Sequence, residues 1–134
     1  MGFQANYTYV NSKFDRPDPR ATYGFPGTSK HNINSILYYE KYGFGARLAY
    51  NYRSDYFNAF GDGNGYRTAY PSFTKGSSQI DASLSYEIGR HFEVTLCGEN
   101  LTRSGRYDYN LYPSFLRAEW TRPRVYSLGV RANF

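Results

Sequence analysis

The stretch V-Y-S-L-G-V-R-A-N-F at residues 125–134 closes the chain and decides its fold. Polar or small residues alternate there with apolar ones, apart from Val125, and a period of two places the apolar side chains on one face of a β-strand. Ordinary strands have ~5 to 6 residues, whereas a tilted strand that crosses a membrane needs ~9 to 11. The stretch therefore predicts a transmembrane β-strand whose apolar positions are Tyr126, Leu128, Val130, Ala132 and Phe134.

Five earlier segments show the same alternation, at residues 2–10, 31–39, 44–53, 78–88 and 92–99. The segment at 31–39 is the least regular, because Ser35 interrupts its apolar positions. The sequence therefore predicts an all-β, antiparallel transmembrane β-barrel fold, of which this chain supplies six strands.

The connections between these segments alternate in length. Long connections at 11–30, 54–77 and 103–122 are rich in Pro, Gly and aromatic residues, and we expect them to be loops. Tight connections are expected at 40–43 and 89–91. Outer-membrane barrels have long external loops and short periplasmic turns, so the alternation predicts which connections lie outside the cell.

Charged residues within the predicted strands from residue 44 onward all occupy the polar positions of the alternation. A lipid-facing Arg or Lys would cost ~2 to 4 kcal/mol at the bilayer midplane. We therefore expect a lumen-facing set made of Arg47, Arg53, Asp81, Glu87, Glu93, Glu99 and Arg131.

The composition excludes several classes of protein. The chain has 16 Tyr and 10 Phe, yet its mean hydropathy is −0.70, and no apolar run is long enough for a transmembrane helix. The net charge is +5, but the basic residues are mixed with acidic ones along the chain and do not line one face. Nucleic acid is therefore not an expected partner. The single Cys97 excludes an internal disulfide, and we expect an inert small residue there. Since no signal peptide is visible and such a protein must be exported, we expect the natural N-terminus to lie upstream.

Six strands do not close a barrel. Single-chain bacterial barrels have at least ~8 strands, and an open sheet in lipid leaves backbone groups unpaired at a cost of several kcal/mol each. We therefore expect these residues to be the last six strands of a larger barrel.

Several motifs point to one family. They are N-Y-T-Y at 6–9, P-G-T-S-K-H at 26–31, Y-Y-E-K-Y-G-F-G-A-R-L-A-Y-N-Y-R-S at 38–54, G-E-N-L-T at 98–102 and the ending R-V-Y-S-L-G-V-R-A-N-F. In this order and spacing the chain resembles the C-terminal β-barrel region of TonB-dependent outer-membrane receptors, over essentially all of residues 1–134.

The resemblance implies a barrel of roughly 22 strands, plugged by an N-terminal domain that is absent from this chain. Such a receptor imports a scarce ligand, a siderophore or a carbohydrate, with energy received from the TonB complex through the plug. Its expected partners are outer-membrane lipid, the small-molecule or oligosaccharide ligand, and the barrel-assembly machinery. The resemblance also implies that this machinery reads the C-terminal assembly signal Tyr126, Leu128, Val130 and Phe134.

The long connections hold the candidate ligand-binding residues. Aromatic rings stack on apolar ligand faces, while neighbouring polar groups bind hydroxyls or carboxylates. The proposed set is Tyr66, Tyr70, Tyr107, Tyr109, Tyr112, Arg117 and Trp120. The alternative is that these rings pack on one another or lie in the aromatic belt at the membrane interface.

Other functions find less support. His31 and His91 stand apart from any second ligand, so we expect neither a metal site nor a cofactor. No nucleophile, base and carboxylate can be placed together, so an enzyme is not expected. A truncated barrel with a structural, pore or adhesin-like role and no active transport is the alternative function.

Overall fold

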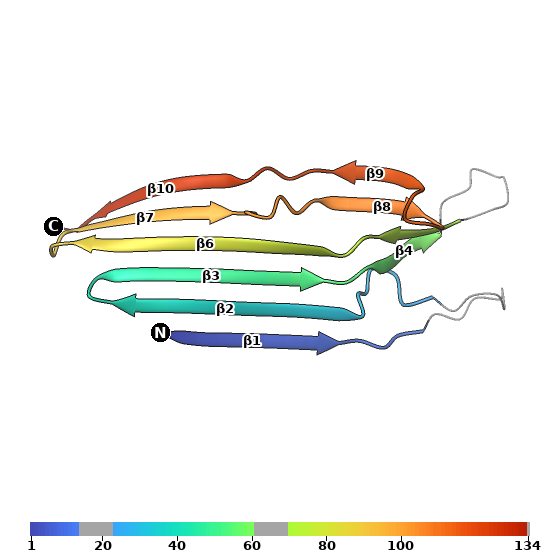
Figure 1. The fold of residues 1–134 in the computed structure, drawn as a ribbon, viewed down its shortest axis with the longest axis horizontal. Helices are drawn as coiled ribbons and strands as arrows, with labels where there is room; N and C mark the ends of the chain where they lie inside the picture. The colour runs from blue at the N-terminus through green and yellow to red at the C-terminus, as the bar shows by residue number, and fades with distance from the viewer. Residues whose placement is uncertain (14–22, 61–69, 134) are drawn as a thin grey trace.

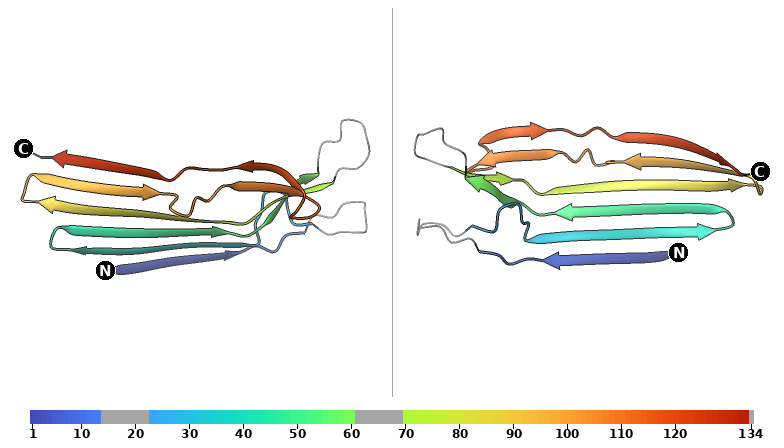
Figure 2. Two further views of the ribbon diagram at one scale, coloured as in Figure 1. Left: turned by 45° about the horizontal axis from the view of Figure 1, so that its top comes forward. Right: turned by 180° about the vertical axis from the view of Figure 1, so that it is seen from behind.

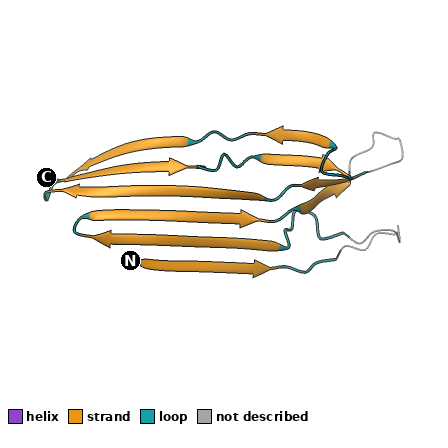
Figure 3. Ribbon diagram, in the orientation of Figure 1, coloured by secondary structure: helices purple, strands orange, loops and turns teal. Residues whose placement is uncertain are grey.

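A computed structural model of the chain describes residues 1–13, 23–60 and 70–133. Ten β-strands and their connections make up these residues, and Figure 3 shows no helix among them. Accordingly, the described part of the chain has no helix of the length and apolarity that crossing a membrane requires. The all-β prediction is confirmed.

Six strands form one antiparallel main sheet, in the order β1-β2-β3-β6-β7-β10. Figure 1 shows them side by side, and Figure 2 shows that they form a single layer. They match the six predicted strands to within two residues at each end. Their bounds are β1 Gly2–Tyr9, β2 His31–Lys41, β3 Phe44–Arg53, β6 Ser77–Ile88, β7 Phe92–Glu99 and β10 Val125–Ala132.

The main sheet is open. Strands β1 and β10 lie at its two opposite edges and do not pair with each other (Figure 1). A closed barrel, and the number of its strands, therefore remain predictions.

The two tight turns were predicted correctly and lie at the same end of the main sheet as both chain ends (Figure 1). Between β2 and β3, Tyr42 and Gly43 have φ of 54° and 75°, and two successive positive φ values suit a two-residue hairpin turn. Gly89, with φ of 66°, begins the turn between β6 and β7. The described parts of the long connections are at the other end (Figure 1).

Two long connections are not loops, and the prediction was wrong there. They contain four short strands, which form a second antiparallel sheet in the order β4-β5-β8-β9, called the small sheet below. Irregularities between Phe57 and Ala59 and between Asp108 and Tyr109 break the alternation that would have revealed the strands. The strands are β4 Tyr56–Phe60, β5 Pro71–Thr74, β8 Arg106–Asn110 and β9 Leu116–Trp120.

The register of the main sheet separates its side chains into two faces. Leu84 lies between Ala46 on β3 and Leu96 on β7, whereas its neighbour Ser83 lies between Arg47 and Cys97. Because partners in register point to the same side, one face is mainly apolar and the other mainly polar. Strand β2 departs from this, with Ile36 and Tyr38 on the polar face and Ser35 on the apolar face. The apolar face is uncovered and includes exposed Phe3, Tyr7, Leu37, Leu48, Leu84, Leu96, Leu128 and Val130.

The buried apolar residues are in the small sheet instead. Phe73 lies 5.9 Å from Phe57 and 5.5 Å from Tyr109, ring centre to ring centre. Tyr23, from the first long connection, stacks on Phe57 at 5.1 Å. This aromatic cluster ties the three long connections together at one end of the molecule.

Candidate functional site

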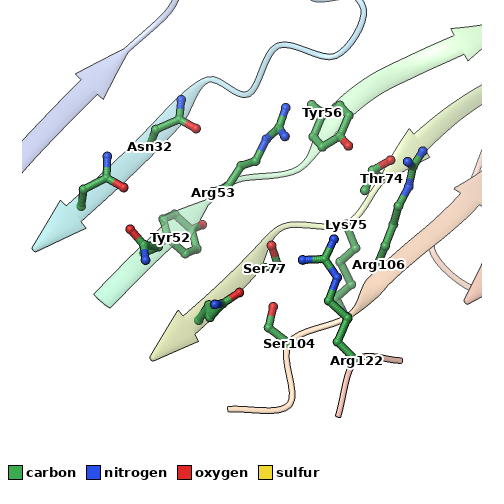
Figure 4. A pocket seen from close by; sticks show the side chains of 14 residues that line it. Asn32, Tyr52, Arg53, Tyr56, Thr74, Lys75, Ser77, Ser104, Arg106 and Arg122 are labelled. Atoms are coloured by element: carbon green, nitrogen blue, oxygen red, sulfur yellow. The ribbon is translucent and has the colours of Figure 1, made fainter. Parts of the chain in front are cut away.

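A hollow of about 480 Å³ lies where the polar face of the main sheet meets the small sheet. Figure 4 shows side chains from β2, β3, β5, β8 and the connections around it. Most of its lining is polar, and the four charged side chains in it are all cationic. The amide side chains are Asn32, Asn34, Asn51 and Gln79, and the cations are Arg53, Lys75, Arg106 and Arg122.

The amides form the floor of the hollow. Asn51 on β3 lies opposite Asn34 on β2 and opposite Gln79 on β6, so the three form a row across the sheet. Gln79 Nε2 donates to both carboxylate oxygens of Asp81, at 3.0 and 3.1 Å. This contact fixes the amide of Gln79 beside the hollow.

Arg53 is held in place by the end of the first long connection. Its Nε donates to Ser29 Oγ at 2.7 Å, and its guanidinium also donates to the carbonyl of Gly27. The guanidinium carbon lies 3.9 Å from the ring centre of Tyr56, a cation–π contact. The Asn32 amide donates to the Ser29 carbonyl at 3.2 Å, so the same segment orients two lining residues.

Arg106, itself exposed, is held by two buried polar residues of the small sheet, Asp108 and Thr74. Its Nε donates to Asp108 Oδ1 at 2.9 Å, and Thr74 Oγ1 donates to the same oxygen at 2.7 Å. The hydrogen bond to Asp108 raises the pKa of Arg106 above its usual range, so this guanidinium stays charged. Asp108 is only 3% exposed and is well placed to neutralise part of the Arg106 charge.

Lys75 and Arg122 complete the wall. The Lys75 ammonium lies 5.8 Å from the Tyr107 ring centre, and its backbone N–H donates to the Tyr107 carbonyl at 2.8 Å. The backbone of Arg122 is fixed by the Asn100 side chain, which donates to its carbonyl at 3.2 Å. Within the described residues the only ion pair is Arg106–Asp108, so Arg53, Lys75 and Arg122 are cations without a carboxylate partner there.

The predicted lumen-facing residues share one face of the main sheet. Arg47 lies opposite Ser83, Asp81 opposite Ala49, and Glu93 opposite both Glu87 and Arg131. Glu99 is an even number of residues from Glu93 on β7, and Arg53 an even number from Arg47 on β3, so both are on this same face. Only Arg53 of the seven lines the hollow. That this face borders a lumen remains a prediction.

The predicted ligand-binding residues do not meet in the hollow, and Tyr66 lies outside the described residues. Tyr109 is 7% exposed and packs in the aromatic cluster. Its burial, together with the Asp55 carboxylate to which it hydrogen-bonds, raises the pKa of the phenol. Trp120 lies beneath the Arg106 guanidinium at 5.3 Å, and Arg117 Nη1 donates to the buried Ser72 hydroxyl at 3.1 Å.

The remaining members of that set are on the surface of the small sheet. The Tyr107 hydroxyl donates to the Pro113 carbonyl at 3.1 Å, within the hairpin of β8 and β9. Tyr70 and Tyr112 are exposed. Their role in ligand binding remains a prediction.

The sequence interpretation missed most of the hollow. Lys75, Arg106 and Arg122 lie near the ends of the long connections, close to the strand ends. Four cationic residues near strand ends could have indicated a cationic site. Because the long connections were interpreted as loops, there was no reason to expect these residues to be close in space. In the described part of the chain, no three or more His, Cys, Asp or Glu residues are grouped so that they could hold a metal ion.

The described residues of the predicted C-terminal signal are on the apolar face of β10. Tyr126, Leu128 and Val130 are 65%, 71% and 67% exposed, and Leu128 and Val130 lie opposite Leu96 and Val94. Phe134 lies outside the described residues. Recognition of these residues by assembly factors remains a prediction.

Long antiparallel strands, a mainly apolar and a mainly polar face, and alternating short and long connections are typical of the wall of a membrane β-barrel. The family model described as "TonB dependent receptor-like, beta-barrel" matches residues 1–101. The chain therefore belongs to the TonB-dependent receptor barrel family, a family of outer-membrane transporters. Comparison with curated proteins gave no match, and comparison with solved structures gave none.

Proposed function

We propose that this chain is part of the barrel wall of an outer-membrane receptor for the energy-coupled uptake of a scarce nutrient, a carbohydrate or a siderophore. The observation that carries the proposal is the pair of faces of the main sheet. One is apolar and uncovered, and the other is polar and leads to the hollow at the end with the long connections.

The apolar face supports a lipid-contacting role. It spans six strands, and its side chains include Leu128 and Val130, which are mostly exposed. Soluble proteins rarely expose a contiguous apolar patch of more than a few hundred Å². Lipid tails would cover this face without requiring a protein partner.

The open edges support a larger assembly. The free edges of β1 and β10 carry unpaired backbone groups, which in lipid would cost several kcal/mol each. Further strands of the same receptor would pair with both edges. We propose that residues 1–134 are the C-terminal portion of that barrel, and that a separate plug domain contacts the TonB complex.

The different connections at the two ends of the main sheet support one orientation of the sheet in the outer membrane. Short turns face the periplasm in outer-membrane barrels and long connections face outward. The small sheet and the hollow would then be external, where a ligand arrives first. In this arrangement the seven charged residues of the polar face line the lumen, and β10 presents its apolar residues to lipid and to the assembly machinery.

An uptake experiment tests the proposal. Cells that express the intact gene receive either radiolabelled mixed oligosaccharides or radiolabelled ferric siderophores, with and without an agent that collapses the proton gradient. We expect one pool to accumulate, and the agent to abolish its accumulation. Entry that does not depend on the proton gradient would indicate a pore instead. If neither pool entered the cells, a receptor function would be contradicted.

A further inference from the structure

We propose that the hollow binds an acidic oligosaccharide, with Lys75 and Arg122 contacting its carboxylates and the row of amides contacting its hydroxyls. The inference rests on the proposed function and specifies its ligand class. It is drawn from the charge and the hydrogen-bonding groups of the hollow.

The charge of the hollow favours an anion. Four cations line it, and no acidic side chain does. Arg106 is paired with Asp108, and Arg53 already donates to Ser29 and Gly27 and stacks on Tyr56. Lys75 and Arg122 are therefore the cations with the most freedom to meet a ligand. Grouped like charges repel one another, and a bound carboxylate would relieve that repulsion.

The uncharged groups favour a sugar. Side-chain amides both donate and accept hydrogen bonds, as sugar hydroxyls do. Asn34 and Asn51 lie side by side on the floor, with the Ser77 and Ser104 hydroxyls at one wall (Figure 4). The volume of about 480 Å³ is within the usual range of ligand sites, ~300 to 1,000 Å³.

The aromatic residues argue against a flat, apolar ligand at this position. The Phe57, Phe73 and Tyr109 rings are packed against one another in the small sheet, away from the hollow. Two tyrosines do line it: Arg53 lies over the ring of Tyr56, and Tyr52 occupies a position of the apolar face on β3, opposite Ile33. Recognition in the hollow must therefore rely on charge and hydrogen bonds.

A matched pair of probes tests the inference. The galacturonate trimer and its methyl ester have the same rings and hydroxyls, but only the trimer has free carboxylates. Binding is measured by equilibrium dialysis with outer-membrane vesicles that contain the full-length receptor, and vesicles without it serve as the blank. We expect the acid to bind at least about tenfold more tightly than the ester, and added salt to reduce this difference.

Charge variants assign the contacts. Lys75→Gln and Arg122→Gln should each weaken binding of the acid about tenfold and leave the weak binding of the ester unchanged. Arg90→Gln, in the turn at the far end of the sheet, removes the same charge and should have no effect. Arg122→Lys should restore part of the binding, and the amount of each variant in the membrane shows that it assembles.

Equal binding of acid and ester, no binding of the acid, or equal effects of Arg90→Gln and Arg122→Gln would overturn the inference. The cations of the hollow would then form ion pairs with other parts of the receptor and not with a ligand. Gradient-dependent uptake of either pool in the experiment above would still support a receptor, so the two failures are distinguishable.

Discussion

The side-chain amide of Asn100, just after β7, donates to the Arg122 carbonyl at 3.2 Å and joins the two connections that flank the hollow. It also donates to Pro123 and Ser104 carbonyls, while its oxygen accepts from the Ser104 N–H at 2.7 Å. Its own N–H donates to Asp81 Oδ1 at 2.8 Å. The G-E-N-L-T motif thus has a physical role: its buried Asn fixes the path of the chain from β7 to β8 and into β10.

Replacing Asn100 should loosen this junction. Asn100 has φ of 53°, a conformation that Asn and Gly tolerate better than Ala. Asn100→Gly keeps the backbone but leaves several carbonyls without their donor, so the free energy of unfolding should fall by about 1 to 3 kcal/mol. Asn100→Ala should lose roughly 1 kcal/mol more through backbone strain.

Urea unfolding of the full-length receptor in lipid vesicles measures both changes. Asn6→Ala, at an exposed position on β1, is the control and should change the stability little. An Asn100→Gly variant as stable as the wild type would show that the amide contacts do not hold the junction.

Phe57 should hold the small sheet together. It is 4% exposed and lies between Tyr23 and Phe73. Phe57→Ala removes a buried ring, at a cost of about 3 kcal/mol or more, which corresponds to roughly a hundredfold faster hydrogen exchange of β5 amides through local opening. Phe115→Ala, at an exposed position, should leave the exchange unchanged. Similar exchange in both variants would contradict a packed small sheet.

Alkaline pH should destabilise the small sheet through Tyr109. Burial and the Asp55 carboxylate raise the pKa of the phenol, so its neutral form is favoured in the folded state. This stabilisation is complete below about pH 10, the usual pKa of Tyr, and is lost as the pH rises through the folded pKa. Exchange of β8 amides, corrected for intrinsic rates, should therefore rise above pH 10 in the wild type. It should rise less in Tyr109→Phe, and identical profiles would contradict the assignment.

Arginine substitutions at two adjacent positions should show which face of the main sheet contacts lipid. Leu84→Arg places a charge on the apolar face, at a cost of ~2 to 4 kcal/mol near the bilayer centre, and should reduce the assembled protein in the outer membrane. Ser83→Arg, on the polar face, should assemble normally. Val130→Arg and Ser127→Arg should repeat the contrast on β10. Equal amounts of all four variants would argue against lipid contact.

The main sheet could be predicted from the sequence because most of its long strands alternate apolar and polar residues. Strands such as β3 and β7 follow this alternation without interruption, and their predicted bounds match the structure. The small sheet could not, because its strands have four or five residues and two of its pairings are irregular. Nothing in so short a pattern distinguishes a strand from an aromatic loop.

The hollow could not be predicted from the sequence, for a related reason. Its floor comes from three strands whose amides the alternation placed on one face, as with Asn34 and Asn51. Its cationic wall depends on how β5, β8 and the segment before β10 are brought together at the end of that face (Figure 1). Lys75 and Arg122 are 47 positions apart in the sequence, and only the pairing of β5 with β8 and the Asn100 contacts bring their segments together.

The central claim, that one face of the main sheet contacts lipid, is tested most directly by spin labels at residues 83 and 84. The native Cys97 is first replaced by Ser, and Ser83→Cys and Leu84→Cys are each labelled in the full-length receptor in bilayers. The label at 84 should relax fastest with oxygen, which concentrates in lipid, and the label at 83 with a water-soluble nickel complex. The same accessibility at both positions, or the reverse order, would contradict the account.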